Sequence, residues 1–456
     1  MENKAIDQVQ TMNQKSFQFT IDKCVGCHAC VVACSIENQS IQSIPWREIN
    51  TFNANGLPDI PLFHFSLACN HCEDAPCMKN CPAIAYSKDF STGAIVHTGN
   101  KCIGCKYCTW ACPYDAPKFN IKTRIIEKCT FCNHRIVDGF KPACANLCPT
   151  GALDFIDKPA ELLHQNISGF TDIGIKPAIK IISTSKEKHS LVVSEYQTNL
   201  KPRTNIKKHS KISVINEWPL IIFTFLAMIL VSVFTSSILG YTKPSADIFV
   251  LSGIAGAILS MMHLGKKLRA WRSILNLKNS WLSREIFSFS LFLGLSIFYF
   301  FINNHILIGY FTIIIGVISL ISIDKVYKCA MQAIPLEIHS AHVLLSFFLF
   351  TALFSEAYNA LIFIAIIKVI LYIYRKFEMR NLKKNHRLLI SGLRIDMLVS
   401  FPLIFWFFGI SNIFWWLTAS ILIGEIIDRI EYYDELDIIT PAKQIEIDLD
   451  KKFKME

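Results

Sequence analysis

The stretch Cys24-Val-Gly-Cys-His-Ala-Cys-Val-Val-Ala-Cys34 begins the region that decides the fold of the first third of this 456-residue chain. Sixteen of the seventeen cysteines lie from Cys24 to Cys148, in four groups of four. The groups are Cys24, Cys27, Cys30 and Cys34; Cys69, Cys72, Cys77 and Cys81; Cys102, Cys105, Cys108 and Cys112; and Cys129, Cys132, Cys144 and Cys148. Groups one and three have the spacing C-x2-C-x2-C-x3-C, and groups two and four carry a longer insert between C-x2-C and C-x3-C.

This spacing is the one that [4Fe–4S] clusters require. Three thiolates from a tight loop bind one face of a cluster, and the fourth cysteine, three residues later, binds the neighbouring cluster. Proline directly follows the last cysteine of groups two, three and four, as Pro82, Pro113 and Pro149, and turns the chain away. Because such groups work in pairs, the four groups predict four clusters.

Two other uses of cysteine fit the pattern less well. Zinc ribbons also use C-x2-C pairs, but a ribbon needs only two pairs and gives no reason for a third cysteine or for a fourth before proline. A disulfide framework is typical of secreted proteins, and the start of the chain, MENKAIDQVQ, has neither an apolar core nor a twin arginine. The seventeenth cysteine, Cys329, lies far from the others and is expected to be a free thiol.

The composition divides the chain into two parts. Residues 1–211 have the composition of a soluble domain, whereas residues 218–430 consist largely of apolar runs of about 18–22 residues, long enough to cross a bilayer as helices. The whole chain is 52% hydrophobic, with a mean hydropathy of +0.35. A net charge of +10 is compatible with nucleic-acid binding, but many basic residues flank the apolar runs, so membrane topology explains them better.

In the first part we expect short strands at Phe17–Ile21 and Gly93–His97, ahead of cysteine loops, and a return strand at Ala152–Ile156. This order suits a duplicated ferredoxin-like module, in which the clusters organise the fold. The predicted fold class is an α+β ferredoxin-like duplicated 4Fe-4S domain followed by an all-α eight-helix transmembrane bundle. The predicted parts are residues 1–190 (four-cluster domain), 191–217 (basic linker), 218–430 (membrane anchor with a quinol site) and 431–456 (cytoplasmic tail).

Eight membrane helices are expected, near residues 218–240, 246–264, 284–302, 305–323, 338–356, 359–375, 393–410 and 412–428. Basic residues concentrate before the first helix and in the loops after the second, fourth and sixth, whereas the opposite loops contain only Lys243. By the positive-inside rule, the sequence predicts a multi-pass protein of the cell (inner) membrane with both termini and the cluster domain in the cytoplasm.

The stretch from Met262 to Glu285 is the most informative part of the membrane half. It brings four ionisable side chains and two tryptophan anchors to one interface: His263, Arg269, Arg284, Glu285, Trp271 and Trp281. A quinol that is oxidised releases two protons, and histidine is the natural acceptor near neutral pH. His263 is therefore a candidate catalytic residue, together with Arg269 and Glu285. The alternative is an interfacial histidine among basic anchors.

Ionisable residues inside the later helices are further candidates: Glu425 first, and also Lys368, Asp396 and Glu356. A snorkelling or paired structural role is the alternative for each of them. A haem b would need axial histidines on facing helices. Because His305, His339 and His342 all fall near helix ends, no haem is expected.

These motifs resemble two subunits of one enzyme class. Residues from about 15 to 190 resemble the four-cluster iron–sulfur subunit of dimethyl sulfoxide reductase-type molybdoenzymes, through CVGCHACVVAC, CNHCEDAPCMKNCP, CIGCKYCTWACPYDAPKFN and KCTFCNHR…PACANLCPTGAL. Residues from about 215 to 430 resemble the membrane anchor subunit of the same complexes, through the eight expected helices, HLGKKLRAWRSILNLKNSWLSRE and the late GEIIDR. The chain therefore looks like a fusion of the two subunits.

The resemblance implies how the cysteines are shared among four clusters. The ligand sets would be Cys24, Cys27 and Cys30 with Cys148; Cys129, Cys132 and Cys144 with Cys34; Cys69, Cys72 and Cys77 with Cys112; and Cys102, Cys105 and Cys108 with Cys81. It also implies a quinol site without haem and strengthens His263 as a candidate. The chain departs from the family in two ways: the two subunits are one chain, and the family's reductases are often exported, whereas the charge pattern favours a cytoplasmic cluster domain.

Together these features predict the electron-transfer and membrane-anchor chain of an anaerobic respiratory reductase. Menaquinol would be oxidised near His263, and electrons would pass through four [4Fe–4S] clusters to a separate molybdopterin catalytic subunit; no nucleic-acid partner is expected. One alternative is the reverse flow, in which quinone is reduced. Another is a cluster relay for an ion-moving respiratory complex, although the scattered ionisable candidates do not outline a path across the bilayer.

Overall fold

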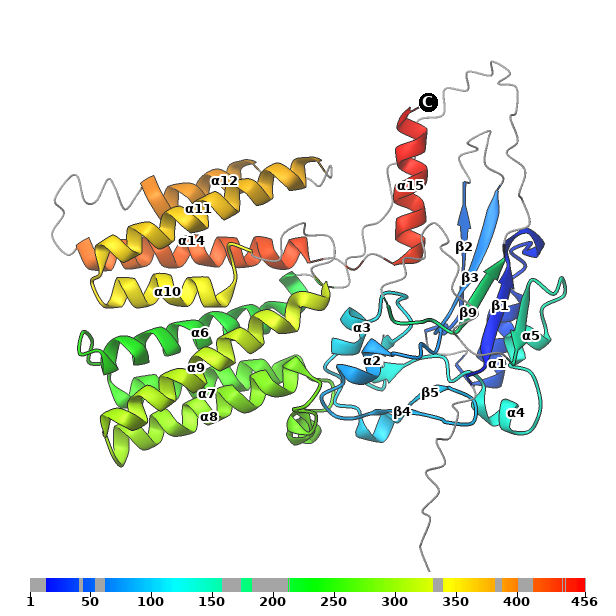
Figure 1. Cartoon of the computed structure of the whole chain (residues 1–456), viewed down its shortest axis with the longest axis horizontal. Coiled ribbons are helices and arrows are strands. Elements are labelled where there is room, and N and C mark those ends of the chain that lie inside the picture. The colour runs from blue at the N-terminus through cyan, green and yellow to red at the C-terminus, as the bar shows by residue number, and fades with distance from the viewer. Residues whose placement is uncertain are drawn as a thin grey trace, which may run out of the picture. The chain divides into compact units, whose positions relative to one another are not determined.

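The computed structural model describes residues 14–40, 44–53, 62–157, 174–182, 212, 214–330, 339–381, 388–400, 413–436, 438 and 440–455. The chain forms two compact units, Met1–His209 together with Ile439–Glu456, and Ser210–Ile438. We call the first the cysteine unit and the second the helical unit (Figure 1). The division falls where the sequence changes from polar to apolar.

Short strands lead into each cysteine group. β1 (Ser16–Thr20) precedes group one and lies between β8 (Leu153–Ile156), which is antiparallel to it, and β9 (Ile179–Ile182), which is parallel. Three antiparallel pairs precede the other groups: β2 (Glu48–Phe52) with β3 (Phe63–Leu67), β4 (Tyr86–Lys88) with β5 (Ile95–His97), and β6 (Lys118–Asn120) with β7 (Ile125–Glu127). The structure thus has strands at the three places where the sequence predicts them.

The cysteine loops continue into short helices. These are α1 (Ala29–Glu37), α2 (Pro76–Lys79), α3 (Tyr107–Ala111), α4 (Asn133–Val137) and α5 (Ala143–Asn146). Groups one and three repeat the same backbone: Gly26 and Gly104 have φ angles of +67° and +71°, and His28 and Lys106, which precede the helices, have 62° and 59°. Left-handed backbone at four matched positions is costly for the two residues that are not glycine. Its recurrence agrees with an internal duplication.

Aromatic side chains form the small core of the cysteine unit. Phe17 and Phe19 share one face of β1 because side chains alternate along a strand, and both are buried. The Phe17 ring packs edge-to-face on Phe131 with centroids 4.9 Å apart, and Phe19 packs in the same way on Phe65 at 5.3 Å. The core thus joins the segments that carry cysteine groups one, two and four.

The C-terminal residues differ from the expected tail. α14 (Ile413–Glu435) continues the helical unit as far as Glu435, beyond the predicted end of the last membrane helix. α15 (Pro441–Met455) contacts β2 and belongs to the cysteine unit. The chain therefore returns to its first unit after the last long helix. Most of the predicted linker, 191–217, lies outside the described residues.

The helical unit contains a set of packed helices (Figure 1). In addition to α14 they are α6 (Val214–Ile238), α7 (Ala246–Met262), α8 (Trp281–Phe301), α9 (Ile306–Tyr327), α10 (Val343–Phe354), α11 (Tyr358–Asn381) and α12 (Leu388–Ile395). Consecutive helices pack as α6–α7, α8–α9 and α10–α11, and α6 also contacts α9, α10 and α14. α6 is therefore the centre of the unit, as its many buried side chains also indicate.

Three of the described helices, α6, α8 and α9, are long and apolar enough to cross a membrane. α7 and the following 3₁₀ helix η4 (Lys267–Ile274) form a fourth span if the pair, which bends by 104°, counts as one. α10 is apolar but has only 12 residues. The predicted span 393–410 begins in α12 and a π-helical turn at Asp396–Ser400, and its remainder lies outside the described residues. The helical region is thus that of a membrane protein, and the count of eight spans stays a prediction.

Candidate redox site

The sixteen clustered cysteines come together as four cages. Cage 1 contains Cys24, Cys27, Cys30 and Cys148; cage 2 contains Cys34, Cys129, Cys132 and Cys144; cage 3 contains Cys69, Cys72, Cys77 and Cys112; and cage 4 contains Cys81, Cys102, Cys105 and Cys108. Cages 1, 3 and 4 each surround a cavity that the proline after the fourth cysteine also lines. Each cage takes three cysteines from one group and the fourth from another. The four groupings match the ligand sets that the resemblance implied, and the binding of a cluster by each of them stays a prediction.

Cage 2 is defined by contacts among its members. The Asn38 side-chain amide lies 3.8 Å from the sulfurs of both Cys34 and Cys132. Cys34 interacts electrostatically with Cys144 and Cys132, and Cys129 does so with Cys34 and Cys144. Two helices, α1 and α5, pack against each other here and bring the separate groups together.

The donor set of the cages fits iron–sulfur clusters, which take four cysteine thiolates each. Backbone N–H groups donate to ligand sulfurs at 3.4 Å, from Gly104 to Cys102, from Phe131 to Cys129 and from Leu153 to Cys148. Such bonds stabilise thiolate charge. Burial, with repulsion from Cys144, raises the pKa of the Cys34 thiol to about 12. A bound iron–sulfur core would supply the positive charge that keeps buried sulfurs ionised, and cluster binding would then be coupled to folding.

The cages follow one another in a series. Cys30 of cage 1 and Cys34 of cage 2 both lie on α1. Cys129 of cage 2 is close enough to Cys69 of cage 3 for their charges to interact. α2 and α3 pack together and join cages 3 and 4. α2 contains Cys77 of cage 3 and ends two residues before Cys81 of cage 4. α3 contains Cys108 of cage 4 and is followed by Cys112 of cage 3. The order 1-2-3-4 is thus continuous within the unit.

The stretch that the sequence singled out in the membrane half lies at one end of α7 and α8. His263 ends α7 and is half-buried. The chain then bends into η4, in which Arg269 is half-buried while Leu268 and Trp271 are 97% and 62% exposed. Exposed apolar side chains on a helix beside a membrane span are typical of a segment that lies on the membrane surface. Glu285, one turn into α8, is buried.

Glu285 has charged neighbours that sequence reasoning did not name. It interacts electrostatically with Arg429 of α14 and with Asp324 of α9. The buried Arg429 donates to the Ala341 carbonyl oxygen at 2.8 Å and lies over the Tyr433 ring at 5.6 Å. The available signal was the run of charged residues, Arg429 among them, that begins with GEIIDR after an apolar stretch in α14. An arginine buried at membrane depth is a functional or pairing residue by default.

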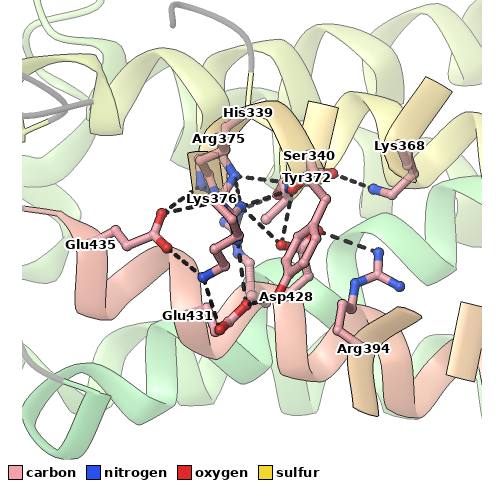
Figure 2. A network of polar contacts seen from close by, with 12 residues as sticks. His339, Ser340, Lys368, Tyr372, Arg375, Lys376, Arg394, Asp428, Glu431 and Glu435 are labelled. Carbon is pink, nitrogen blue, oxygen red and sulfur yellow. Dashed lines mark hydrogen bonds and ion pairs between the residues drawn. The ribbon is translucent and has the colours of Figure 1, made fainter. Parts of the chain in front are cut away.

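A second polar cluster joins α11, α12, α14 and the segment before α10 (Figure 2). Two of the predicted candidates meet in it: Lys368 Nζ lies 3.0 Å from Glu425 Oε2, and Arg394 Nη2 lies 2.7 Å from Glu425 Oε1. Ser346 also donates to Glu425 at 2.6 Å. We call the whole set the ion network. Its further ion pairs are Arg394 with Asp428, Arg375 with Asp428, Glu431 and Glu435, Lys376 with Glu431 and Glu435, and His339 with Glu435.

The other candidates lie elsewhere. Glu356 is exposed in the turn after α10, and Asp396 is exposed at the start of the π-helical turn. His305 and His342 are N-cap residues of α9 and α10. Cys329 lies in the 3₁₀ turn Lys328–Ala330, in the helical unit. The structure therefore brings together Lys368 and Glu425 but not Asp396 or Glu356.

Two family models match separate parts of the chain. The 4Fe-4S dicluster domain matches residues 60–158, and the DMSO reductase anchor subunit family matches residues 212–382. One of the chains of the anaerobic dimethyl sulfoxide reductase of Escherichia coli is 36% identical over 150 residues, which are 31% of this chain and 73% of the relative. This chain is a member of the iron–sulfur and anchor subunit family of dimethyl sulfoxide reductase-type enzymes.

Other relatives of the family differ in the reaction that their names state. A sulfite dehydrogenase subunit of Allochromatium vinosum is 35% identical over 167 residues, 32% of this chain and 70% of the relative. The arsenate respiratory reductase iron–sulfur subunit of a Shewanella species is 31% identical over 207 residues, 34% of this chain and 88% of the relative. The present chain joins the iron–sulfur part and the anchor part of the family. It is thus a membrane protein that relays electrons to a catalytic subunit.

Proposed function

We propose that this chain oxidises menaquinol in its helical unit and passes single electrons through four [4Fe–4S] clusters to a molybdopterin-containing catalytic subunit. The observation that carries the proposal is the unbroken series of four cages, each with four cysteines. When bound, each cluster supplies a one-electron redox step. The polypeptide holds the clusters in order, and all sixteen cysteines of the cages are the proposed ligands.

His263 and Glu285 are the proposed proton acceptors of the quinol site. A quinol releases two protons with its two electrons, so two acceptors at one end of the helical unit suit the reaction. His263 lies half-buried at the end of α7, next to the segment that we assign to the membrane surface. Glu285 is buried, and Arg429 provides the positive charge that a carboxylate needs at membrane depth. Arg269, in η4, is the proposed contact to the headgroup region.

Glu425 has a different proposed role. Both of its carboxylate oxygens already bind other side chains, Arg394 on one and Lys368 and Ser346 on the other. A carboxylate in two ion pairs is a poor proton acceptor, because protonation would break both of them. We therefore assign Glu425 to holding α11, α12 and α14 together rather than to proton transfer.

The proposed topology has eight spans with both termini on one side of the membrane. Chain connectivity supports an even number, since α6 follows the cysteine unit and α15 returns to it directly after α14. The asymmetry of the basic residues favours the cytoplasmic side. Cage 1 is the proposed electron outlet, because Cys27 is the exposed member of the described cages while cages 2 and 3 are fully buried.

Metal analysis of the complex tests the proposal first. The complex would be purified anaerobically from membranes through a tag on this chain. About sixteen irons per chain, with molybdenum or tungsten and a large co-purifying subunit, are expected. Sixteen irons without molybdenum or tungsten would contradict the molybdopterin partner and leave a quinone-linked relay of another complex.

Two substitutions test the quinol site. His263→Ala and Glu285→Gln are each expected to abolish cluster reduction by a menaquinol analogue while dithionite still reduces the clusters. Glu356→Gln, in an exposed turn, is the matched control, and its clusters should be reduced by the menaquinol analogue at the rate seen in the unmodified protein. Unchanged reduction in both site variants, with the complex assembled, would remove the site.

A second candidate function is the reverse flow, in which the catalytic partner oxidises its substrate and this chain reduces quinone. One relative is named as a subunit of a sulfite dehydrogenase, an enzyme that oxidises its substrate, and this name supports the reverse flow as an alternative. Rates in the unmodified complex decide between the two: quinone-dependent cluster oxidation that greatly exceeds quinol-dependent cluster reduction would support the reverse direction.

A further inference from the structure

Arg47 is a buried cation in the middle of the cysteine unit. It lies directly before β2, and its side chain is 2% exposed. Its Nη1 donates to Ser66 Oγ on β3 at 2.9 Å, and its guanidinium lies over the Phe17 ring at 4.8 Å. Its Nε has no hydrogen-bond partner among the residues that the structure describes. Phe17 and Ser66 do not neutralise the charge, so something else must stabilise it in this dry interior.

The groups that interact most strongly with the Arg47 charge are cysteines of two cages. In order of strength they are Cys144, Cys30, Cys129 and Cys34. Arg47 also hydrogen-bonds the Cys144 side chain. Cys30 belongs to cage 1 and the other three to cage 2. The guanidinium therefore interacts with cysteines of both cages. A buried arginine is normally paired with a carboxylate, and here cysteine sulfurs take the place of that carboxylate.

A short hydrogen-bond chain extends this effect to cage 1. Because Arg47 donates to the Ser66 oxygen, the Ser66 hydroxyl hydrogen is left to donate elsewhere. Cys30 Sγ lies 3.5 Å from Ser66 Oγ. Ser66 is 1% exposed and also lines the cage 1 cavity, so water does not compete for this bond. Cage 1 thus receives a hydroxyl donor that Arg47 orients, and cage 2 receives the guanidinium itself.

We propose that Arg47 raises the reduction potentials of the clusters in cages 1 and 2 relative to those in cages 3 and 4. Reduction adds one electron to a cluster and so increases its negative charge. A nearby buried cation stabilises the reduced form more than the oxidised form, and hydrogen bonds to ligand sulfurs act in the same direction. The proposal rests on the proposed function, since it assumes clusters in these cages. Arg47 acts on them through their ligands.

Redox titration of the anaerobically purified complex, followed by electron paramagnetic resonance, tests the proposal. Arg47→Met removes the charge at similar volume. We expect at least a tenfold fall in the reduced-to-oxidised ratio of two clusters at a fixed ambient potential, which is about 59 mV for a one-electron couple. The other two clusters should keep their potentials within a small fraction of that shift. Arg47→Lys, which keeps the charge, should restore most of the change.

Arg135→Met is the matched control. Arg135 follows the cage 2 ligand Cys132 by three residues, but it is partly exposed and its charge is paired with Glu37 at 2.9 Å. Its loss should leave all four potentials nearly unchanged. If Arg47 had only a structural role, Arg47→Met would leave the reduction potentials unchanged, as Arg135→Met should. Unchanged potentials in Arg47→Met with full iron content would therefore overturn the proposal.

Ser66→Ala keeps the proposal testable if Arg47→Met loses iron. It removes only the hydroxyl and should lower the potential of the cage 1 cluster while leaving cage 2 unchanged. No shift in Ser66→Ala, together with iron loss in Arg47→Met, would assign Arg47 to folding instead. An iron content of the unmodified complex well below about sixteen per chain would contradict the proposed function itself. Iron analysis therefore distinguishes failure of the proposed function from failure of the proposal for Arg47.

Discussion

Buried positive charges have different neighbours in the two units. In the cysteine unit, Arg47 and Lys128 are each 2% exposed and lie beside cysteines, and Lys128 donates to the carbonyl oxygens of Ile95 and Cys129. In the helical unit, four cations face four carboxylates in the ion network. The cations are Lys368, Arg375, Lys376 and Arg394, and the carboxylates are Glu425, Asp428, Glu431 and Glu435.

The difference indicates where each unit obtains its compensating charge. A buried cation is stable only beside negative charge or strong acceptors. The ion network is neutral by itself, so it holds helices together without any bound group. The cations of the cysteine unit lie beside sulfurs, whose negative charge depends on bound iron. The cations of the ion network therefore pair with carboxylates and hold helices together, whereas Arg47 and Lys128 have sulfurs as their neighbours.

Removal of a cluster ligand should have the largest effect. Cys144→Ser breaks cage 2, in the middle of the series, and we expect loss of about four of sixteen irons and of electron flow from quinol to the catalytic subunit. Cys329→Ser, in the helical unit, is the control and should keep full iron content. Iron analysis and cluster spectra of the purified complex measure both. Full iron and unchanged flow in Cys144→Ser would show that cage 2 binds no cluster.

Disruption of the ion network should be the next largest effect. Lys368→Met leaves Glu425 with one fewer partner in a buried site, and we expect a loss of about 3–5 kcal/mol of stability. Lys368→Met combined with Glu425→Leu should recover most of that loss, because no charge is left uncompensated. Thermal unfolding of the complex in detergent measures both variants, with the exposed Lys325→Met as control. Equal loss in the single and double variants would contradict the pairing account.

Lys128→Met should have a smaller effect on the clusters. Lys128 interacts electrostatically with Cys77 of cage 3, so its loss should lower the potential of the cage 3 cluster, by less than the shift of at least about 59 mV expected for Arg47→Met. Burial and the Lys128 charge lower the pKa of His97 to about 4, and this pKa should rise in the variant. Redox titration of the variant complex is the measurement. A shift at cage 3 larger than that of Arg47→Met at cages 1 and 2 would reverse the proposed ranking.

The smallest expected effect is at the turn before β5. Hydrogen bonds from Ser91 and Asn133 lower the pKa of Asp89 to about 2, against about 3.9 in an unfolded chain. A lowered pKa gives stability that is present above the unfolded value and is lost as the pH falls from about 4 towards 2. Asp89→Asn should therefore lower the free energy of unfolding by about 1 kcal/mol, and this loss should be the same at every pH from 5 to 8. Denaturant unfolding at these pH values measures it, and a cost that grows with pH across this range would rule out the assignment.

Local spacing determined the chemistry of the cysteine unit. The ligands of each loop lie within a few residues of one another, so C-x2-C-x2-C and the proline after the fourth cysteine predict cluster loops before any fold is known. The strands ahead of the loops were predictable for the same reason, since alternation at Phe17 and Phe19 is a property of neighbouring residues. Membrane character followed from apolar runs such as α6 and α9.

Tertiary structure decided where the charges lie. Arg47 stands in a spacer between cysteine groups, and only the pairing of β2 with β3 brings it to Ser66 and to cages 1 and 2. Lys368 and Glu425 looked scattered along the sequence, yet α11 and α14 place them in one ion pair. Arg429 reaches Glu285 from the far end of the chain in the same way. The physical reason is the sequence separation of the residues that interact. The ligands of a cluster loop lie within a few consecutive residues, whereas the surroundings of a buried charge depend on which distant segments pack around it.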